Sequence, residues 1–315
     1  MYKIGVDIGG TKIAVGLVSS VGKVIDRIIE PTVFYNQEKG TIQQIIRMIN
    51  SIRSRNKDKK VVSIGVGCPG PLDPHKGIIY APPNMKGWNK VYLGRELRKH
   101  FKNKIVIDND ANAAALAEWK FGAGKGTKDM IYLTISTGVG SGIIIDGRLY
   151  RGLGSAGELG HCTINYKNGP KCKCGLRGCL EAYISGTSLI SEAKKKKYKK
   201  SLIYKIAKKG NKISPAIIFQ VARKGDKIAK EIITKACEAF AFALINIIHT
   251  FHPEKIILGG GIMKDADLII PAVRKIITQY KLKGFQGSCQ IAKARLGDNI
   301  GIIGAAELTN LNKNL

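Results

Sequence analysis

A strand, a glycine turn and a second strand occur twice in this chain, and this repeat constrains the fold more than any other feature. Residues 4–18, IGVDIGGTKIAVGLV, match residues 131–146, IYLTISTGVGSGIIID, with Gly138 at the position of Gly9. Apolar strands flank the turn in both copies, as in a β-hairpin. Strand-like runs elsewhere alternate with helix-like runs, which favours parallel α/β sheets. The chain is therefore predicted to be an α/β protein with two related halves, although glycine-rich hairpins can also match by chance.

Apolar periodicity and turn residues predict the individual elements. A Pro-rich loop should follow the strand that ends at residue 67 and run to Trp88. One long, strongly apolar helix, KEIITKACEAFAFALINIIHTF, must be buried. Strands are expected at 2–8, 13–18, 23–30, 61–67, 105–107, 255–260 and 289–293, with a second hairpin over 131–146 closed by Asp146-Gly147, and helices at 40–54, 111–119, through much of 187–252, up to about 280 and from about 300.

The composition describes a folded protein with a large positive charge. Of the 315 residues 44% are hydrophobic, which is enough for a proper core, and the formal net charge is +29. The N-terminus lacks a signal-peptide pattern and no segment is expected to reach the roughly 18 apolar residues of a membrane span, so we expect a cytoplasmic protein without a membrane partner. The basic residues are mostly lysines spread along the chain, with one run at 194–200. They indicate solvated helix faces rather than nucleic-acid binding, and their field could attract nucleotides or polyphosphate.

Residues 104–122, KIVIDNDANAAALAEWKFG, place acidic side chains between a strand and a helix. The apolar run 105–107 is followed by an aspartate that can cap the helix, and then by strong helix formers. Open α/β sheets bind ligands where strands end and helices begin. Asp110 is therefore the candidate catalytic base, and the alternative is that the acids Asp108 and Asp110 only cap the helix.

Three glycine-rich turns, at 7–12, 136–142 and 259–262, each follow an apolar strand. Backbone N–H groups in such turns can approach a phosphate closely, although each turn alone could be a simple tight turn. None fits the P-loop or the dinucleotide-binding glycine pattern. Asp7 is placed to hold Mg²⁺ through water, and Thr11 and Lys12 could meet phosphate oxygens.

Four soft or borderline metal ligands, His161, Cys172, Cys174 and Cys179, occur within nineteen residues. They predict a closed Cys₃His zinc site with a structural role, and the alternative is a set of buried thiols with a capping histidine. Cys162 should face away from this group, and the remaining cysteines, Cys68, Cys237 and Cys289, are expected to be core thiols. Glu158 and Glu181 bracket the ligands, so a metal that fixes the segment would fix two carboxylates able to bind sugar hydroxyls.

With DIGGTK, CPGPLD, NDANAAALAE, STGVGSG, GELGH and CxCGxxGCLE in this order, nearly the whole chain resembles the ROK family (repressor, open reading frame, kinase), and within it the bacterial glucokinases. The resemblance implies an actin-like (ribonuclease H-like) ATPase fold with two domains around a central cleft. The expected domains are 1–112, completed by 300–315, and 113–299. The repressors carry a DNA-binding helix-turn-helix ahead of this module, whereas this chain starts at the first strand and therefore resembles the kinases.

The resemblance also implies an activity and a set of site residues. The activity is transfer of the ATP γ-phosphoryl group to the 6-hydroxyl of a hexose, with glucose as the expected substrate. A kinase for N-acetylmannosamine, N-acetylglucosamine, fructose or mannose and a non-catalytic sugar-responsive regulator are the alternatives. Mg²⁺, a structural Zn²⁺ and a homodimer or homotetramer are expected. The implied residues are Asp110 as general base; Asn84, Asn109, Asp110, Glu158, His161 and Glu181 for the sugar; Asp7, Gly9, Gly10, Thr11, Lys12, Thr137, Gly138, Gly259 and Gly260 for the nucleotide; and His161, Cys172, Cys174 and Cys179 for zinc.

Overall fold

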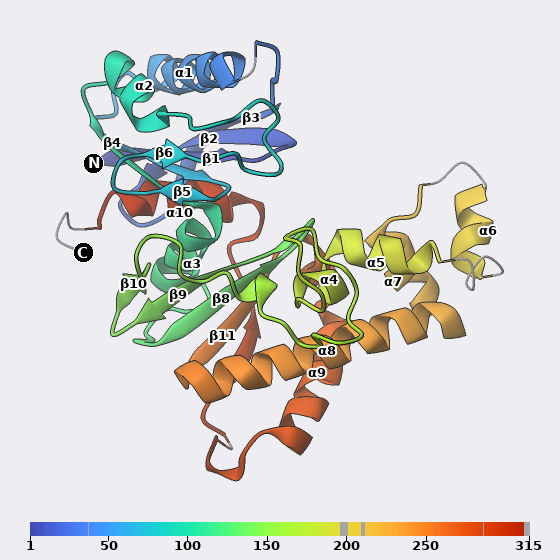
Figure 1. The fold of residues 1–315 in the computed structure, drawn as a ribbon. Coiled ribbons are helices and arrows are strands. Elements are labelled where there is room, and N and C mark those ends of the chain that lie inside the picture. The colour runs from blue at the N-terminus through green and yellow to red at the C-terminus, as the bar shows by residue number, and fades with distance from the viewer. Residues whose placement is uncertain (37, 196–200, 209–211, 286, 312–315) are drawn as a thin grey trace. The chain divides into compact units, whose positions relative to one another are not determined.

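The chain divides into two compact units. The computed structural model describes all residues except 37, 196–200, 209–211, 286 and 312–315 (Figure 1), so the predicted lysine run lies outside the described residues apart from Lys194 and Lys195. Unit 1 comprises Met1–Tyr132, Gly142–Gly157 and Ala294–Leu315, and unit 2 comprises Leu133–Ser141 and Glu158–Lys293. The expected domain boundary after residue 112 falls inside unit 1, and the division at that residue stays a prediction.

Unit 1 is built on a five-stranded sheet with the order β3-β2-β1-β4-β7. Its strands are β1 (Tyr2–Ile8), β2 (Lys12–Ser19), β3 (Val24–Pro31), β4 (Val61–Cys68) and β7 (Lys104–Asn109). The first three pair antiparallel, as the predicted hairpin requires, whereas β1, β4 and β7 run parallel. The carboxyl ends of these three parallel strands therefore lie at one edge of the sheet.

Helices cover both faces of this sheet (Figure 1). On one face α1 (Glu38–Arg55) and α2 (Leu93–His100) bury apolar side chains against alternate residues of the strands. Sequence reasoning did not anticipate α2, although Leu93, Leu97 and Phe101 are buried at helical spacing. The other face carries α3 (Asp110–Phe121) and α10 (Ile300–Leu308). A short pair, β5 (Leu72–Asp73) and β6 (Ile78–Ile79), lies within the predicted Pro-rich loop.

Two glycines allow α10 to lie directly on the sheet. A Cβ atom at Gly65 of β4 would lie 1.7 Å from the carbonyl oxygen of Ala305, and one at Gly5 of β1 would lie 1.9 Å from that of Ile302. Both distances are far below van der Waals contact, so only residues without a side chain allow this approach. The C-terminal helix is thereby fixed on β1, whose end carries Asp7, and on the neighbouring strand β4.

A second five-stranded sheet has the order β10-β9-β8-β11-β12, and the boundary between the units passes through two of its strands. The predicted Asp146-Gly147 turn is confirmed, because it joins the antiparallel strands β9 and β10 with positive φ at both residues. The strands of this sheet are β8 (Met130–Ile135), β9 (Val139–Ile145), β10 (Arg148–Tyr150), β11 (Lys255–Gly259) and β12 (Gln290–Lys293).

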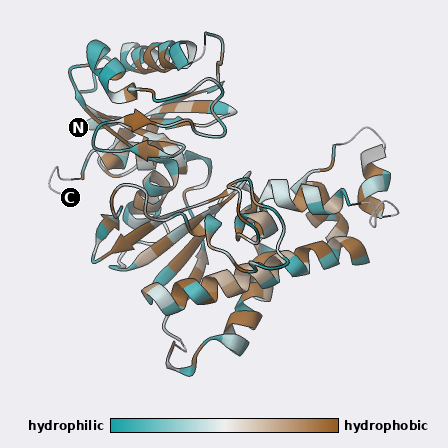
Figure 2. Ribbon diagram, in the orientation of Figure 1, coloured by the Kyte–Doolittle hydropathy of each residue, from teal (hydrophilic) through white to brown (hydrophobic). Residues whose placement is uncertain are grey.

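The helices of unit 2 include α8, which is the long apolar helix expected from the sequence. Its residues alternate between hydrophobic and hydrophilic along the helix (Figure 2), and residues such as Phe240 and Leu244 are fully buried. These helices are α4 (Glu181–Ile184), α5 (Gly186–Ala193), α6 (Leu202–Lys208), α7 (Pro215–Arg223), α8 (Lys227–Phe251) and α9 (Ala266–Tyr280). Single 3₁₀ turns are η1 (Leu159–His161), η3 (Gly261–Asp265) and η4 (Lys283–Phe285) in unit 2 and η5 (Gly297–Asn299) in unit 1.

Contrary to the expectation from the sequence, one helix among the described residues, α8, is long and apolar enough to cross a membrane. However, 67% of its apolar window is buried inside the protein. The apolar residues of α8 therefore pack against protein, as in a core helix.

Candidate functional site

The carboxyl edge of the unit 1 sheet gathers acidic side chains from two strands. Asp7 on β1 pairs with Gly67 on β4, and Gly67 in turn pairs with Asp108 on β7. These three residues form one row across the sheet, in which the middle position has no side chain. Asp110 begins α3 directly after β7. The candidate base therefore lies at the sheet edge where open α/β folds bind ligands.

Asp108 is a fully buried structural acid. Its Oδ1 accepts hydrogen bonds from the backbone N–H of Asn109 at 2.7 Å and from the side-chain amide of Asn112 at 2.9 Å. Its Oδ2 accepts a hydrogen bond from Nε of Arg151 at 2.6 Å. Both carboxylate oxygens of Asp108 thus accept hydrogen bonds inside the protein, which gives this acid a structural role.

The cap of α3 is Asn109, so the prediction of an aspartate cap was wrong. The Asn109 side-chain oxygen accepts from the backbone N–H of Ala111 at 2.8 Å and from that of Asn112 at 3.4 Å. Asp108 cannot take this role because its carboxylate faces Arg151 and the amide of Asn112. The Asp110 carboxylate accepts a hydrogen bond from the backbone N–H of its neighbour Ala111 at 2.8 Å.

Asp7 is an acid that is held close to other acids. Burial raises its pKa to about 7, the charge of Asp110 adds to this rise, and Lys12 opposes it. Burial also raises the pKa of the Cys68 thiol, and there the charges of Asp110, Asp108 and Asp7 all contribute. A divalent cation would relieve this excess of negative charge, so the residues present fit the predicted Mg²⁺.

The turn between β1 and β2 lies beside the expected sugar residue Asn84. The N–H of Gly9 donates to the carbonyl of Lys12 at 3.0 Å, which closes the turn. A Cβ atom at Gly10 would lie 2.4 Å from the backbone oxygen of Asn84, so glycine is needed for this approach. Thr11 and Lys12 are exposed. Unit 1 therefore brings together the first glycine turn and Asn84, and places Asp7 and Asp110 in each other's electrostatic field.

In unit 2 the other two predicted glycine turns meet each other. Gly260, at the end of β11, has φ +88°, and a Cβ there would lie 2.3 Å from the carbonyl oxygen of Ile135 at the end of β8. The first turn of α5 joins them, because the N–H of Gly186 donates to the carbonyl of Ser136 at 2.7 Å and the hydroxyl of Thr187 donates to that of Thr137 at 3.0 Å. Two glycine turns and the first turn of α5 thus lie together, and a helix N-terminus favours a negatively charged ligand.

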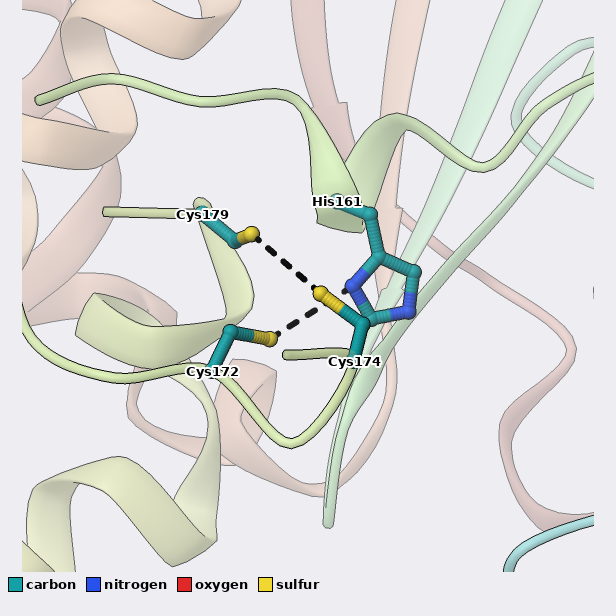
Figure 3. A group of neighbouring side chains, drawn as sticks. All are labelled: His161, Cys172, Cys174 and Cys179. Carbon is teal, nitrogen blue, oxygen red and sulfur yellow. Dashed lines mark hydrogen bonds between the residues drawn. The ribbon is translucent and has the colours of Figure 1, made fainter. Parts of the chain in front are cut away.

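The four predicted zinc ligands converge in unit 2 (Figure 3). One ligand atom from each of His161, Cys172, Cys174 and Cys179 lies within 4.8 Å of every other. Nδ1 of His161 is 3.6 Å from Sγ of Cys172, and Sγ of Cys174 is 3.6 Å from Sγ of Cys179. Local turns create this grouping. Cys172 donates its N–H to the carbonyl of Leu176 at 2.8 Å, and Thr163 forms a bridge with Cys179.

The donor set fits Zn²⁺, because one imidazole and three thiolates are the ligands of many structural zinc sites. Without a cation, burial and the neighbouring thiols raise the pKa of Cys179 to about 12. A bound cation would reverse this effect and keep the thiols deprotonated. The exposed Cys162 takes no part in the group, as predicted. Cys68 and Cys237 are buried as expected of core thiols, whereas Cys289 is partly exposed.

Glu181 links the metal-ligand group to a glycine turn. Its Oε2 accepts the backbone N–H of Val139 at 3.0 Å, and its Oε1 lies 3.9 Å from Sγ of Cys172. A Cβ at Gly138 would be only 2.5 Å from Glu181 Oε2. The second bracketing acid, Glu158, is exposed, and its carbonyl accepts the N–H of His161 at 2.9 Å. The structure thus brings Glu181 and His161 to the same ligand group.

Sequence reasoning missed two contributors to these groups. Arg151 pairs with Asp108, and Thr187 contacts the β8–β9 turn. The segment around Arg151, LYRGLG, carries no pattern that indicates a partner far away in the chain. Thr187 is preceded by Ser185, which caps α5, and a serine cap before an apolar run was a usable signal for a helix N-terminus.

Comparison with known proteins gives matches along almost the whole chain. The model of the ROK family matches residues 3–311. A glucokinase from Thermotoga maritima is 37% identical over 308 residues, which cover 97% of this chain and 96% of the relative. The solved structure of a ROK family glucokinase from Streptomyces griseus, in complex with glucose and AMPPNP, superposes with a TM-score of 0.82 at 31% identity and covers 98% of this chain and 99% of that one. A xylose repressor from Bacillus spizizenii is 30% identical over 310 residues, 98% of this chain and 76% of the relative.

The metal-ligand group allows a test by substitution. Purified protein should contain about one zinc per chain, and Cys174→Ser should lose it, because a three-ligand site binds the metal much more weakly. Sugar affinity should fall by roughly 10-fold or more, since Glu181 and His161 belong to the same group. Metal analysis and a sugar-binding titration measure the two effects. Cys162→Ser is the matched control, and active protein without zinc would contradict the assignment.

The raised pKa of Asp7 predicts a pH-dependent effect on stability. Between pH 3.8 and about 7 the folded protein retains a proton on Asp7 that the unfolded chain has lost, so the free energy of unfolding falls as pH rises through this window. Asp7→Asn removes this dependence. In metal-free buffer it should gain stability relative to wild type as pH rises from 4 to 7, by up to a few kcal/mol at about 1.4 kcal/mol per pKa unit.

Urea unfolding of wild type and Asp7→Asn at several pH values measures this gain. Asp298→Asn, which changes an exposed acid in the same unit, is the control and should follow wild type. Parallel pH curves for Asp7→Asn and wild type would show that the pKa of Asp7 is not raised in the folded protein.

Proposed function

The chain belongs to the ROK family and has its actin-like ATPase fold, and on that premise we propose that it is an ATP-dependent hexose kinase that phosphorylates the 6-hydroxyl of glucose. The position of Asp110 carries this proposal. The side chain stands at the start of α3, and the acid next to it, Asp108, is already fully paired inside the protein. A carboxylate in this position can accept a proton, whereas a protein that only sensed sugar would have no need of a base.

The reaction depends on alignment and on charge neutralisation, since phosphoryl transfer leaves little covalent chemistry to the protein. We assign to Asp110 the hydrogen bond to the 6-hydroxyl and the uptake of its proton as the hydroxyl oxygen attacks the γ-phosphorus. Backbone N–H groups of the turn between β1 and β2, with Thr11 and Lys12, would bind phosphate oxygens. Mg²⁺ held through water at Asp7 would supply charge neutralisation at the phosphates.

Sugar-binding residues are assigned in each unit separately. Asn84 and Asn109, with Asp110, are the assigned sugar residues of unit 1, and each offers hydrogen-bonding atoms to hydroxyls. The residues assigned in unit 2 are Glu158, His161 and Glu181. Zinc would hold His161 and the neighbouring loop in place through a closed set of ligands, without contact with the reacting atoms.

ATP would lie against the two glycine turns of unit 2. Thr137 and Gly138 in the β8–β9 turn, and Gly259 and Gly260 at the end of β11, are the assigned nucleotide residues. Their backbones meet the first turn of α5, whose N-terminus favours negative charge. The glucokinase structure from Streptomyces griseus was solved with the nucleotide analogue AMPPNP, which supports ATP as the phosphoryl donor here.

Glucose is the proposed substrate because relatives at 32–37% identity along nearly the full length are glucokinases. The family's motifs are shared among its sugar kinases, so the choice of hexose is the part of the proposal that assay must decide.

A coupled assay of ADP release over a panel of sugars tests this proposal. With glucose the protein should give the highest kcat/KM, and mannose, fructose, N-acetylglucosamine and N-acetylmannosamine should give lower values. 6-Deoxyglucose is the matched control, since it lacks the accepting hydroxyl and should release ADP only at the background rate of ATP hydrolysis. A higher kcat/KM for another sugar would change the substrate, and absence of transfer to every sugar would refute the kinase activity.

A further inference from the structure

A buried ion pair involves Asp108, which precedes the candidate base by two residues in the sequence. Nε of Arg151 is 2.6 Å from Oδ2 of Asp108, and the two side chains are 12% and 0% exposed. Charges taken out of water at this depth are costly unless both partners are paired and hydrogen-bonded. The pair is therefore stable only as a unit, and loss of one partner leaves the other charge uncompensated.

The carboxylate of this pair holds the start of α3. Its second oxygen, Oδ1, accepts the backbone N–H of Asn109 and the side-chain amide of Asn112. Asn109 in turn caps α3 through its own side chain. Asp110 lies between these two asparagines, so the geometry of its backbone follows from the position of Asp108.

Arg151 also organises the chain segment that leads to Glu158. Its carbonyl accepts the N–H of Gly154 at 2.8 Å and that of Ala156 at 2.9 Å, which folds residues 151–156 into a compact turn. The guanidinium group anchors this turn to β7 through Asp108. One side chain thus fixes both the element that carries Asp110 and the segment that ends next to Glu158 in the sequence.

The electrostatic surroundings give the pair a second effect. Three acids act on the thiol of Cys68 on β4: Asp7 from β1, Asp108 from β7 and Asp110 from α3. The described cations that oppose them are Lys12, which acts on Asp7, and Arg151, which pairs with Asp108. Arg151, with its Nε 2.6 Å from Oδ2 of Asp108, therefore opposes a buried negative charge two residues from Asp110 in the sequence.

We propose that Arg151 is a positioning residue for phosphoryl transfer. Its guanidinium group holds the Asp108 carboxylate in place and opposes its negative charge, so that Asp110 keeps both its backbone geometry and its ionised state. The inference rests on the proposed kinase activity, with Asp110 as the base. It assigns Arg151 no contact with sugar or nucleotide.

The signs of the charge changes distinguish this role from a purely structural one. The wild-type pair is neutral. Asp108→Asn leaves an unpaired positive charge on Arg151, whereas Arg151→Met leaves an unpaired negative charge on Asp108. The double variant Asp108→Asn/Arg151→Met is neutral again and similar in volume.

The experiment measures kcat/KM for glucose against pH at saturating ATP and Mg²⁺. The acid limb, where the base becomes protonated, should move to lower pH in Asp108→Asn and to higher pH in Arg151→Met, each by roughly half a pH unit or more. In the double variant and in Arg151→Lys it should stay near the wild-type position. kcat should fall by about 10-fold or more in Arg151→Met, and Arg151→Lys should recover part of this loss.

Arg47→Met is the matched control, because Arg47 forms an exposed ion pair with Glu30 in the same unit and should leave the profile unchanged. Circular dichroism shows which variants fold. If Arg151→Met does not fold, Asp108→Asn and the double variant still have different expected outcomes: a shift of the acid limb to lower pH in the first and no shift in the second. Acid limbs that coincide in wild type, Asp108→Asn and the double variant would overturn the inference. Wild-type protein without sugar phosphorylation would instead overturn the proposed function.

Discussion

Three parallel strands of unit 1 end at one edge of their sheet, and the candidate site depends on this constraint. The register of β1, β4 and β7 puts Asp7 and Asp108 in one row, although they lie far apart in the sequence. Gly67 between them and Gly65 in the same strand leave room for α3 and α10. Burial raises the pKa of Asp7 to about 7, and the charge of Asp110, which begins α3 directly after β7, adds to this rise.

Two acids at this edge of the sheet, Asp108 and Asp110, have different roles. The carboxylate of Asp108 accepts hydrogen bonds from Nε of Arg151, from the backbone N–H of Asn109 and from the side-chain amide of Asn112. Asp108 therefore has a structural role. Asp110, two residues later, begins the helix and is the acid to which we assign proton transfer. In unit 2 the metal-ligand group does comparable structural work, because Glu181 reaches from it to the N–H of Val139 beside a glycine turn.

The sequence predicted these features where the controlling interactions are local. Apolar runs and glycine turns correctly predicted β1, β2, β8, β9 and α8, because strand and turn conformations depend mainly on residues that are close together in the sequence. The four metal ligands were also predictable, since they lie close together in the chain. Contacts between distant residues were not. The pairing of Arg151 with Asp108 needs β10 and β7 to be placed first, and the cap by Asn109 depends on Asp108 being held elsewhere.

The central claim is that Asp110 accepts the proton of the sugar hydroxyl, and Asp110→Asn tests it most directly. Asparagine keeps the size and the hydrogen-bonding capacity of the side chain but cannot take up the proton. Single-turnover phosphorylation of glucose should slow by at least about 10², while glucose affinity, measured separately by titration, should change only a few-fold. Near-normal turnover in this variant would contradict the account.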